Sequence, residues 1–176
     1  MASPSCVSTS RADRAARLIR GSLAALVPLQ IPTPQPWGTR GRASRTGNPE
    51  GGILPQLGVD LVPISQVRRV FEGKDALLAE VFTEEEIRYC TGQRRPFQHL
   101  AARYAAKEAV FKGLGTGMTG RMRWRDVETV HGAWGEPHLR LRGEVARLAT
   151  AKGLRRCALS LTHAGNYALA AVLLTA

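Results

Sequence analysis

The segment Pro96–Leu114 limits the possible folds more than any other part of the chain, because it reads as one long helix with a largely apolar surface. A proline stands in its first turn, where the missing N–H costs nothing, and Gly115 follows as a helix stop. Leu100, Tyr104 and Phe111 mark its core side, and several alanines allow other elements to approach closely. The sequence therefore predicts a long helix packed against the core.

Shorter segments with strand or helix patterns lie on both sides of this helix. Leu57–Ile64 reads as a buried strand that ends near a proline, and Thr83 with Glu86 forms a capping box that opens a helix. The predicted helices are 65–71, 75–82, 84–89 and 144–152, and the predicted strands are 127–131, 138–142, 157–162 and 167–174. This order predicts an α+β fold, a single module with helices packed on an antiparallel sheet.

The first 53 residues differ in composition from the rest. They are rich in Ser, Ala, Arg and Pro, and such sequence buries little apolar surface. We therefore predict a low-complexity, disordered extension over residues 1–53 and a folded domain over residues 54–176. The Arg- and Ser-rich start also has the composition of a transit peptide, so the expected cytoplasmic location leaves organellar import open.

Charge and cysteine content narrow the class of protein. The net charge is +11, and residues 51–176 carry +6 of it, so the predicted domain is itself basic. A basic domain suits an anionic small ligand, an acidic protein or nucleic acid. The three cysteines are widely spaced and form neither a metal-ligand cluster nor a disulfide framework, and no apolar run is long enough to span a bilayer.

Polar residues in otherwise apolar segments are the candidates for chemistry. Asp60 lies in an apolar strand, where a carboxylate needs a partner or a metal, although it could also cap the next helix. Glu108 and Lys112 share one helix face because they are four residues apart, as an ordinary surface ion pair also would be. His163 stands at a strand end, where it can donate to a phosphate or simply belong to a loop.

A glycine loop follows the long helix directly. In Gly115-Thr116-Gly117 the backbone N–H groups can come close to an anion, and a plain helix stop is the alternative interpretation. An ordinary nucleotide hydrolase would instead need a glycine loop between a strand and a helix, followed by Lys-Ser or Lys-Thr. A nucleic-acid-binding protein would need aromatic residues clustered with arginines, and the domain lacks this pattern.

Taken together, these motifs closely resemble the holo-acyl-carrier-protein synthase family, the short 4'-phosphopantetheinyl transferases. The resemblance covers about residues 57–176. Its four parts are Gly58-x-Asp60 with Ile64, Phe82-Thr83 with Glu86, the central run Arg103–Gly117, and Ser160–His163 followed by Tyr167-Ala168. Residues 1–50 have no counterpart in the family's short form. The resemblance implies a 4'-phosphopantetheinyl transferase-like fold, with coenzyme A as co-substrate and Mg²⁺ as cofactor.

The resemblance also implies roles for the residues. Asp60 and Glu108 would hold Mg²⁺, and Glu108 would activate the acceptor serine either directly or through a metal-bound water. Lys112 would stabilise the departing phosphate, His163 would bind a phosphate of the nucleotide, and the backbone of Gly115, Thr116 and Gly117 would lie against the nucleotide.

The expected partner is an acidic acyl carrier protein, and the sequence leaves open whether it serves fatty-acid or polyketide synthesis. Arg68, Arg69 and Lys74 are the expected contacts, although each could be an ordinary solvated surface charge. No nucleic-acid or membrane partner is expected. Because the chain carries one set of motifs, we expect a homotrimer with active sites at subunit boundaries, in contact through 138–142 and the C-terminal strand.

Overall fold

The computed structural model describes residues 53–176, and the predicted extension therefore lies almost entirely outside the described residues. The described part has helices on an antiparallel sheet, which confirms the predicted α+β class. The elements are β1 Gln56–Pro63, α2 Ile64–Phe71, α3 Asp75–Val81, α4 Glu84–Thr91, α5 Pro96–Gly113, a 3₁₀ turn Trp124–Asp126, β2 Val127–His131, β3 Pro137–Leu141, α6 Gly143–Ala151, β4 Arg156–Ala164 and β5 Tyr167–Thr175.

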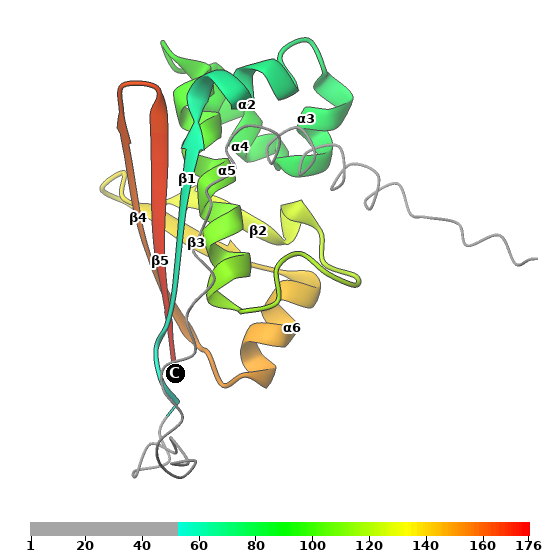
Figure 1. The fold of residues 1–176 in the computed structure, drawn as a ribbon, viewed down its shortest axis with the longest axis vertical. Helices are drawn as coiled ribbons and strands as arrows, with labels where there is room; N and C mark the ends of the chain where they lie inside the picture. The colour runs from blue at the N-terminus through cyan, green and yellow to red at the C-terminus, as the bar shows by residue number, and fades with distance from the viewer. Residues whose placement is uncertain (1–52) are drawn as a thin grey trace, which may run out of the picture.

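Two antiparallel sheets form the framework. One has the strand order β1-β5-β4, and the other pairs β2 with β3. Figure 1 shows the three-stranded sheet on one side of α5, with α2, α3 and α4 grouped towards one end and α6 towards the other. None of the described helices is both long and apolar enough to cross a membrane.

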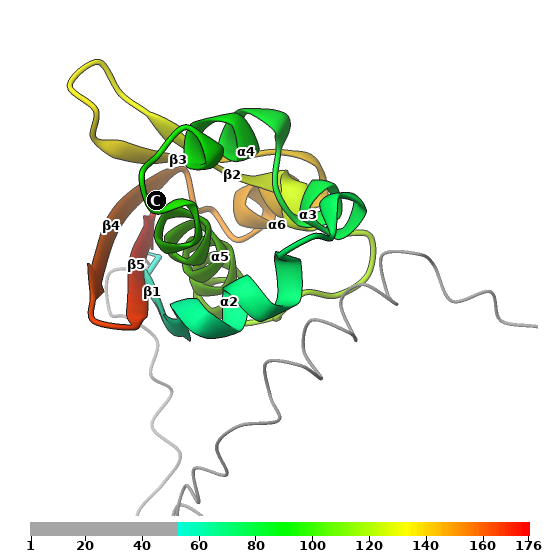
Figure 2. The same cartoon turned by 90° about the horizontal axis from the view of Figure 1, so that it is seen from above.

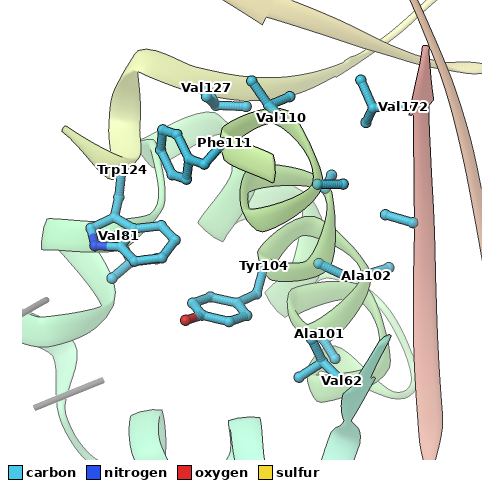
Figure 3. Close-up of a cluster of buried hydrophobic side chains, with 14 of the residues drawn as sticks. Val62, Val81, Ala101, Ala102, Tyr104, Val110, Phe111, Trp124, Val127 and Val172 are labelled. Atoms are coloured by element: carbon cyan, nitrogen blue, oxygen red, sulfur yellow. The ribbon is translucent and has the colours of Figure 1, made fainter. Parts of the chain in front are cut away.

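Helix α5 is the axis of the fold (Figure 2). It is buried around most of its circumference, as expected for a helix that is apolar on nearly all sides. Tyr104 and Phe111 pack their rings against Trp124, at centroid distances of 5.2 and 5.4 Å. In Figure 3 these rings lie on one side of α5, whereas Ala102 lies on the side of β5, which carries Val172.

Strand β1 differs from its prediction. It forms close to the predicted position, but only one of its faces is buried. Gly58 and Val62 are buried towards α5, whereas Leu57, Val59 and Leu61 are 66%, 43% and 56% exposed. The prediction of a buried strand therefore holds for one face only, because no other element of the described chain covers the outer face of this sheet.

The predicted capping box is present at the start of α4. Thr83 Oγ1 accepts from Glu86 N at 3.2 Å, and Thr83 N donates to Glu86 Oε2 at 3.0 Å. The carboxylate of Glu86 does more than cap, because Glu86 Oε2 also accepts from the fully buried Lys107 at 2.7 Å. The cap thereby joins α4 to the central helix.

Candidate active site

Gly58 sets the position of β1 against α5. A Cβ atom at Gly58 would lie 2.8 Å from Gly113 N and from the carbonyl carbon of Ala109, and closer still to the carbonyl oxygen of Ala109. Carbon atoms normally approach to about 3.5–4.0 Å, so only glycine fits here. The strand therefore touches the helix backbone, and Asp60, two residues further on, faces the same helix.

Asp60 and Lys112 form an ion pair across this contact. Lys112 Nζ lies 2.6 Å from Asp60 Oδ1, and the Asp60 side chain is 12% exposed while that of Lys112 is 52% exposed. Burial raises the pKa of the Asp60 carboxyl above its ordinary value, and the hydrogen bond and charge of Lys112 only partly oppose this effect. The arrangement leaves an incompletely compensated carboxylate beside a half-exposed cation.

Glu108 lies one helical turn before Lys112 on α5, as the spacing predicts. Its side chain is half-buried, and Glu108 Oε1 accepts from Tyr104 Oη at 3.2 Å. The structure thus places the three predicted residues Asp60, Glu108 and Lys112 where β1 meets the second half of α5, and Lys112 forms its ion pair with Asp60.

The predicted glycine loop follows α5. Gly115 and Gly117 have φ angles of +73° and +59°, a region that favours glycine. Gly115 N donates to Lys112 O at 2.9 Å, which ends the helix, and a Cβ at Gly115 would meet nothing within 4 Å. Thr116 Oγ1 donates to the Gly117 carbonyl at 3.0 Å. The loop therefore has open space beside its first glycine, as an approaching anion requires.

His163 does not lie with the glycine loop. It is exposed near the end of β4, and its ring centroid is 6.4 Å from that of His99 in the first turn of α5. A helix rises about 1.5 Å per residue, so His99 and Gly115 are separated by roughly 24 Å along the helix axis. Within one chain, the two predicted contacts to the nucleotide stand at opposite ends of α5.

A cluster around His163 was missed by the sequence analysis. Arg103, which is 2% exposed, places its guanidinium 4.2 Å from the centroid of the Tyr89 ring, and its Nη2 lies 3.2 Å from His131 Nε2. Arg103 Nε has no hydrogen-bond partner among the described residues. Burial, followed by the charge of Arg103, lowers the pKa values of His99 and His131. Arg103 was part of a motif, but nothing in the sequence indicated that the histidines of distant elements would join it.

Lys107 precedes Glu108 in the central motif, yet it points into the core. Its ammonium donates to Glu86 Oε2, to the Trp124 carbonyl at 3.3 Å and to the Val127 carbonyl. Desolvation lowers the pKa of Lys107, and the charge of Glu86 opposes that shift. Lys107 therefore holds the interior together, while the next residue faces the candidate site.

A second buried carboxylate extends this ionic network to the other sheet. Glu128 is 2% exposed, and its Oε1 accepts from Thr83 Oγ1 at 3.0 Å. Glu128 Oε2 accepts from Arg140 at 3.2 Å and from Arg142 at 3.0 Å. Arg140 and Arg142 are thereby paired with a buried carboxylate.

The expected carrier contacts lie on and after α2. Arg68 and Arg69 are exposed, and Lys74 precedes α3. Arg68 forms a 3.6 Å ion pair with Glu72, and its guanidinium lies 4.8 Å from the centroid of the Phe97 ring. These basic groups are accessible to an acidic surface.

Comparison with known proteins gives a consistent result. Residues 56–172 match the family model of the 4'-phosphopantetheinyl transferase superfamily. A holo-[acyl-carrier-protein] synthase of Syntrophotalea carbinolica is 48% identical over 120 residues, which cover 68% of this chain and 94% of the relative.

Solved structures agree with this match. A holo-[acyl-carrier-protein] synthase of Neisseria meningitidis is 28% identical, with a TM-score of 0.63 over 69% of this chain and 98% of the other. An ACPS-CoA complex of Chronobacterium ammoniagenes is 31% identical, with a TM-score of 0.60 over 69% and 97% of the two chains. The motifs, the fold and these relatives together show that the chain is an enzyme of the holo-[acyl-carrier-protein] synthase family, within the 4'-phosphopantetheinyl transferase superfamily.

Proposed function

We propose that this protein transfers the 4'-phosphopantetheine group of coenzyme A to a serine hydroxyl of an apo-acyl carrier protein, with Mg²⁺, and releases adenosine 3',5'-bisphosphate. The observation that carries the proposal is the close approach of β1 to α5, which brings Asp60 to Lys112 beside the turn that holds Glu108. The relative from Chronobacterium ammoniagenes, solved as a complex with CoA, supports coenzyme A as the donor.

The donor set fits Mg²⁺. The proposed ligands are the two carboxylates of Asp60 and Glu108, as the family resemblance implies, and residues 53–176 contain no group of three or more His, Cys, Asp or Glu side chains that could hold a metal ion. Mg²⁺ is commonly held in this way, by one or two carboxylates with phosphate oxygens and water. The raised pKa of Asp60 indicates a carboxylate that a second cation would stabilise. When bound, Mg²⁺ would supply positive charge to the phosphate oxygens.

The chain's own residues would move the proton and hold the leaving group. The serine oxygen attacks the phosphorus on the pantetheine side of the pyrophosphate, and the P–O bond to the other phosphate breaks. Glu108 accepts the serine proton, because serine needs a base to become a good nucleophile. Lys112 is half exposed and can exchange Asp60 for an oxygen of the departing phosphate, whose new negative charge it neutralises.

The nucleotide end of coenzyme A would use the His163 cluster. His163 is exposed and offers a donor group to a phosphate, and Gly115–Gly117 would contact the nucleotide by its backbone. Because these two groups lie at opposite ends of α5 in one chain, a single copy does not gather them. We therefore propose that each active site uses His163 of one copy and the glycine loop of another.

The outer face of the three-stranded sheet supports assembly. Leu57, Val59 and Leu61 of β1 continue into Leu173 and Tyr167 of β5, which are 41% and 50% exposed. A contiguous apolar face of this kind marks an interaction surface. We propose a homotrimer, in which β5 makes contact as expected. The exposed side chains of 138–142 are polar, so that segment contributes less apolar contact area.

Two measurements test the function. Mass spectrometry of an apo-acyl carrier protein incubated with the enzyme, coenzyme A and Mg²⁺ should show the added arm, and Asp60→Ala or Glu108→Ala should abolish it without loss of folding. Light scattering should give about three chain masses, and Leu61→Lys should lower this mass. A carrier protein that gains no mass would refute the proposed reaction, and a fully active monomer would refute the shared site.

A further inference from the structure

Helix α5 carries three polar side chains in one row, spaced four residues apart, which places Tyr104, Glu108 and Lys112 on one face of the helix. Exposure rises along this row: Tyr104 is 2% exposed, Glu108 is half-buried, and the side chain of Lys112 is 52% exposed. The proposed reaction uses Glu108 and Lys112. It leaves the phenol at the buried end of the row, one helical turn from a proposed metal ligand, without a chemical role.

The ring of Tyr104 is held in place by two neighbouring rings. Its centroid lies 5.2 Å from that of Trp124, with the two planes inclined by 25°, and 6.3 Å from that of Phe71. Figure 3 shows Tyr104 and Trp124 together among the buried side chains beside α5. A ring packed in this way has little room for another rotamer, so the core defines where its hydroxyl group stands.

The hydroxyl group of Tyr104 connects this fixed ring to the candidate site, because Tyr104 Oη donates to Glu108 Oε1 at 3.2 Å. The last torsion of a glutamate side chain is broad, so its own rotamer preference does not fix the plane of the carboxylate. A donor on a fixed ring supplies that restraint. The bond is longer than the ~2.7–2.8 Å typical of hydroxyl donors, so it contributes more to the orientation of the carboxylate than to the stability of the fold.

We propose that Tyr104 is a positioning residue, whose hydroxyl group holds the Glu108 carboxylate in the orientation that binds Mg²⁺. This inference rests on the proposed function, in which Asp60 and Glu108 are the metal ligands. Carboxylates that bind metal ions are themselves held by hydrogen bonds from neighbouring groups, and loss of such a partner lowers metal affinity or activity about 10–100-fold. Because Tyr104 is buried, it acts through Glu108 and not on the substrates.

The donor to Glu108 differs in kind from the partner of Asp60. Lys112 places a positive charge 2.6 Å from Asp60, and this charge opposes that of an incoming metal ion. A hydroxyl group carries no charge, so Tyr104 restrains the Glu108 carboxylate and leaves its negative charge available to Mg²⁺. The two carboxylates are therefore held by different means, and only the cation is needed later, at the departing phosphate.

The substitution Tyr104→Phe in the full-length protein removes the hydroxyl group and keeps the ring. Electron paramagnetic resonance of free Mn²⁺ measures how tightly the protein binds Mn²⁺ in place of Mg²⁺, and the transfer assay gives the Mg²⁺ concentration at half-maximal rate. We expect both constants to rise by about 10–100-fold. The rate should recover as Mg²⁺ is raised, because excess metal restores occupancy of the site, whereas a general loss of core packing would not respond to Mg²⁺.

The matched control is Val81→Ala, which deletes buried volume from the same core and leaves the Tyr104 hydroxyl group in place. This variant should lower the melting temperature at least as far as Tyr104→Phe does, because it leaves a cavity, yet it should bind Mn²⁺ as the wild type does. The pair of variants thereby separates an effect on metal binding from an effect on stability.

Wild-type affinity for Mn²⁺ in Tyr104→Phe would overturn the inference. Tighter binding would also overturn it, because the hydroxyl group would then hold the carboxylate away from the metal. Equal weakening in Val81→Ala would do the same, since the effect would come from the core as a whole. A wild type that binds no Mn²⁺ and shows no Mg²⁺-dependent transfer would refute the proposed function itself, and the inference with it.

Discussion

Replacing Gly58 by alanine should disturb both stability and catalysis, because of the backbone contact between β1 and α5. The new methyl group would lie 2.8 Å from Gly113 N and from the Ala109 carbonyl carbon, and closer still to the Ala109 carbonyl oxygen, so the strand must withdraw by roughly 1.5 Å to restore ordinary contact distances. Overpacking of this kind costs about 1–3 kcal/mol, and more where backbone must move. For a domain of this size, we expect the melting temperature to fall by about 5–15 °C.

The withdrawal of β1 from α5 should also change the geometry of the active site. Asp60 is two residues from Gly58 on the same face of β1, so the withdrawal of the strand separates its carboxylate from Lys112 and from the turn of Glu108. A misplacement of about 1 Å can lower a rate about 100-fold. We therefore expect kcat/KM for phosphopantetheine transfer to fall by about that factor, even at temperatures where the variant is folded.

Thermal unfolding followed by circular dichroism and a mass-spectrometric transfer assay measure the two effects. Gly92→Ala is the matched control, because its φ is −73° and a Cβ there would lie no closer than 3.4 Å to its nearest neighbour. If Gly58→Ala melts and reacts as Gly92→Ala does, the close approach does not position Asp60, and the reasoning fails.

Four further predictions follow from other contacts. Asp60→Asn should abolish transfer, yet it should raise the melting temperature measured without Mg²⁺ at neutral pH. The folded-state pKa of Asp60 is raised, so ionisation of its carboxyl costs stability as pH rises through that pKa, and the gain in melting temperature should vanish in acid. A lower melting temperature of the variant at neutral pH would show that the ion pair with Lys112 outweighs the cost of burial. Lys107→Met should cost about 3–5 kcal/mol in urea unfolding because it leaves Glu86 buried without its cation, and Lys107→Met/Glu86→Gln should recover part of this loss; a neutral single variant would contradict the buried pair. Charge reversal of Arg68 and Arg69 should raise KM for the carrier protein and not for coenzyme A, with a defect that shrinks as salt increases; equal effects on both substrates would exclude α2 as the carrier contact. A protein that begins at Ile53 should keep its unfolding transition and activity, whereas one that begins at Gln56 should be less stable because it loses the contact of Ile53 with Gly153; insolubility of the longer form would move the domain boundary.

The elements of the fold could be predicted because local signals agreed with the final structure. The proline and glycine that bound α5, the capping box at Thr83 and the alternation in 138–142 all depend on neighbouring residues. The exposure of β1 could not be predicted in this way. Leu57, Val59 and Leu61 are apolar like the buried residues, and their exposure depends on which other strands and helices cover the sheet.

The candidate site was predicted in part for the same reason. Asp60, Glu108 and Lys112 were found through motif spacing, and the structure joins Asp60 to Lys112, with Glu108 one turn earlier on α5. The cluster of Arg103 with three histidines joins residues from α5, β2 and β4, and no local pattern connects them. Lys107 and Glu108 show most clearly what the sequence could not predict. They are adjacent charged residues of the same motif, yet Lys107 faces the core and Glu108 faces the candidate site.

Gly58 of β1 also protects the chain from a folding error. If β1 paired with β5 one residue out of step, every side chain would change faces, as in any strand. Val59 or Leu57 would then meet the backbone of Ala109, where even a methyl group does not fit. Without Gly58 such a slip would be tolerated, because it would bury the exposed apolar side chains Leu57, Val59 and Leu61. The absence of a side chain at Gly58 therefore selects the native register. In the shifted register, a side chain would clash with the backbone of α5, and the carboxylate of Asp60 would lie on the outer face of the sheet.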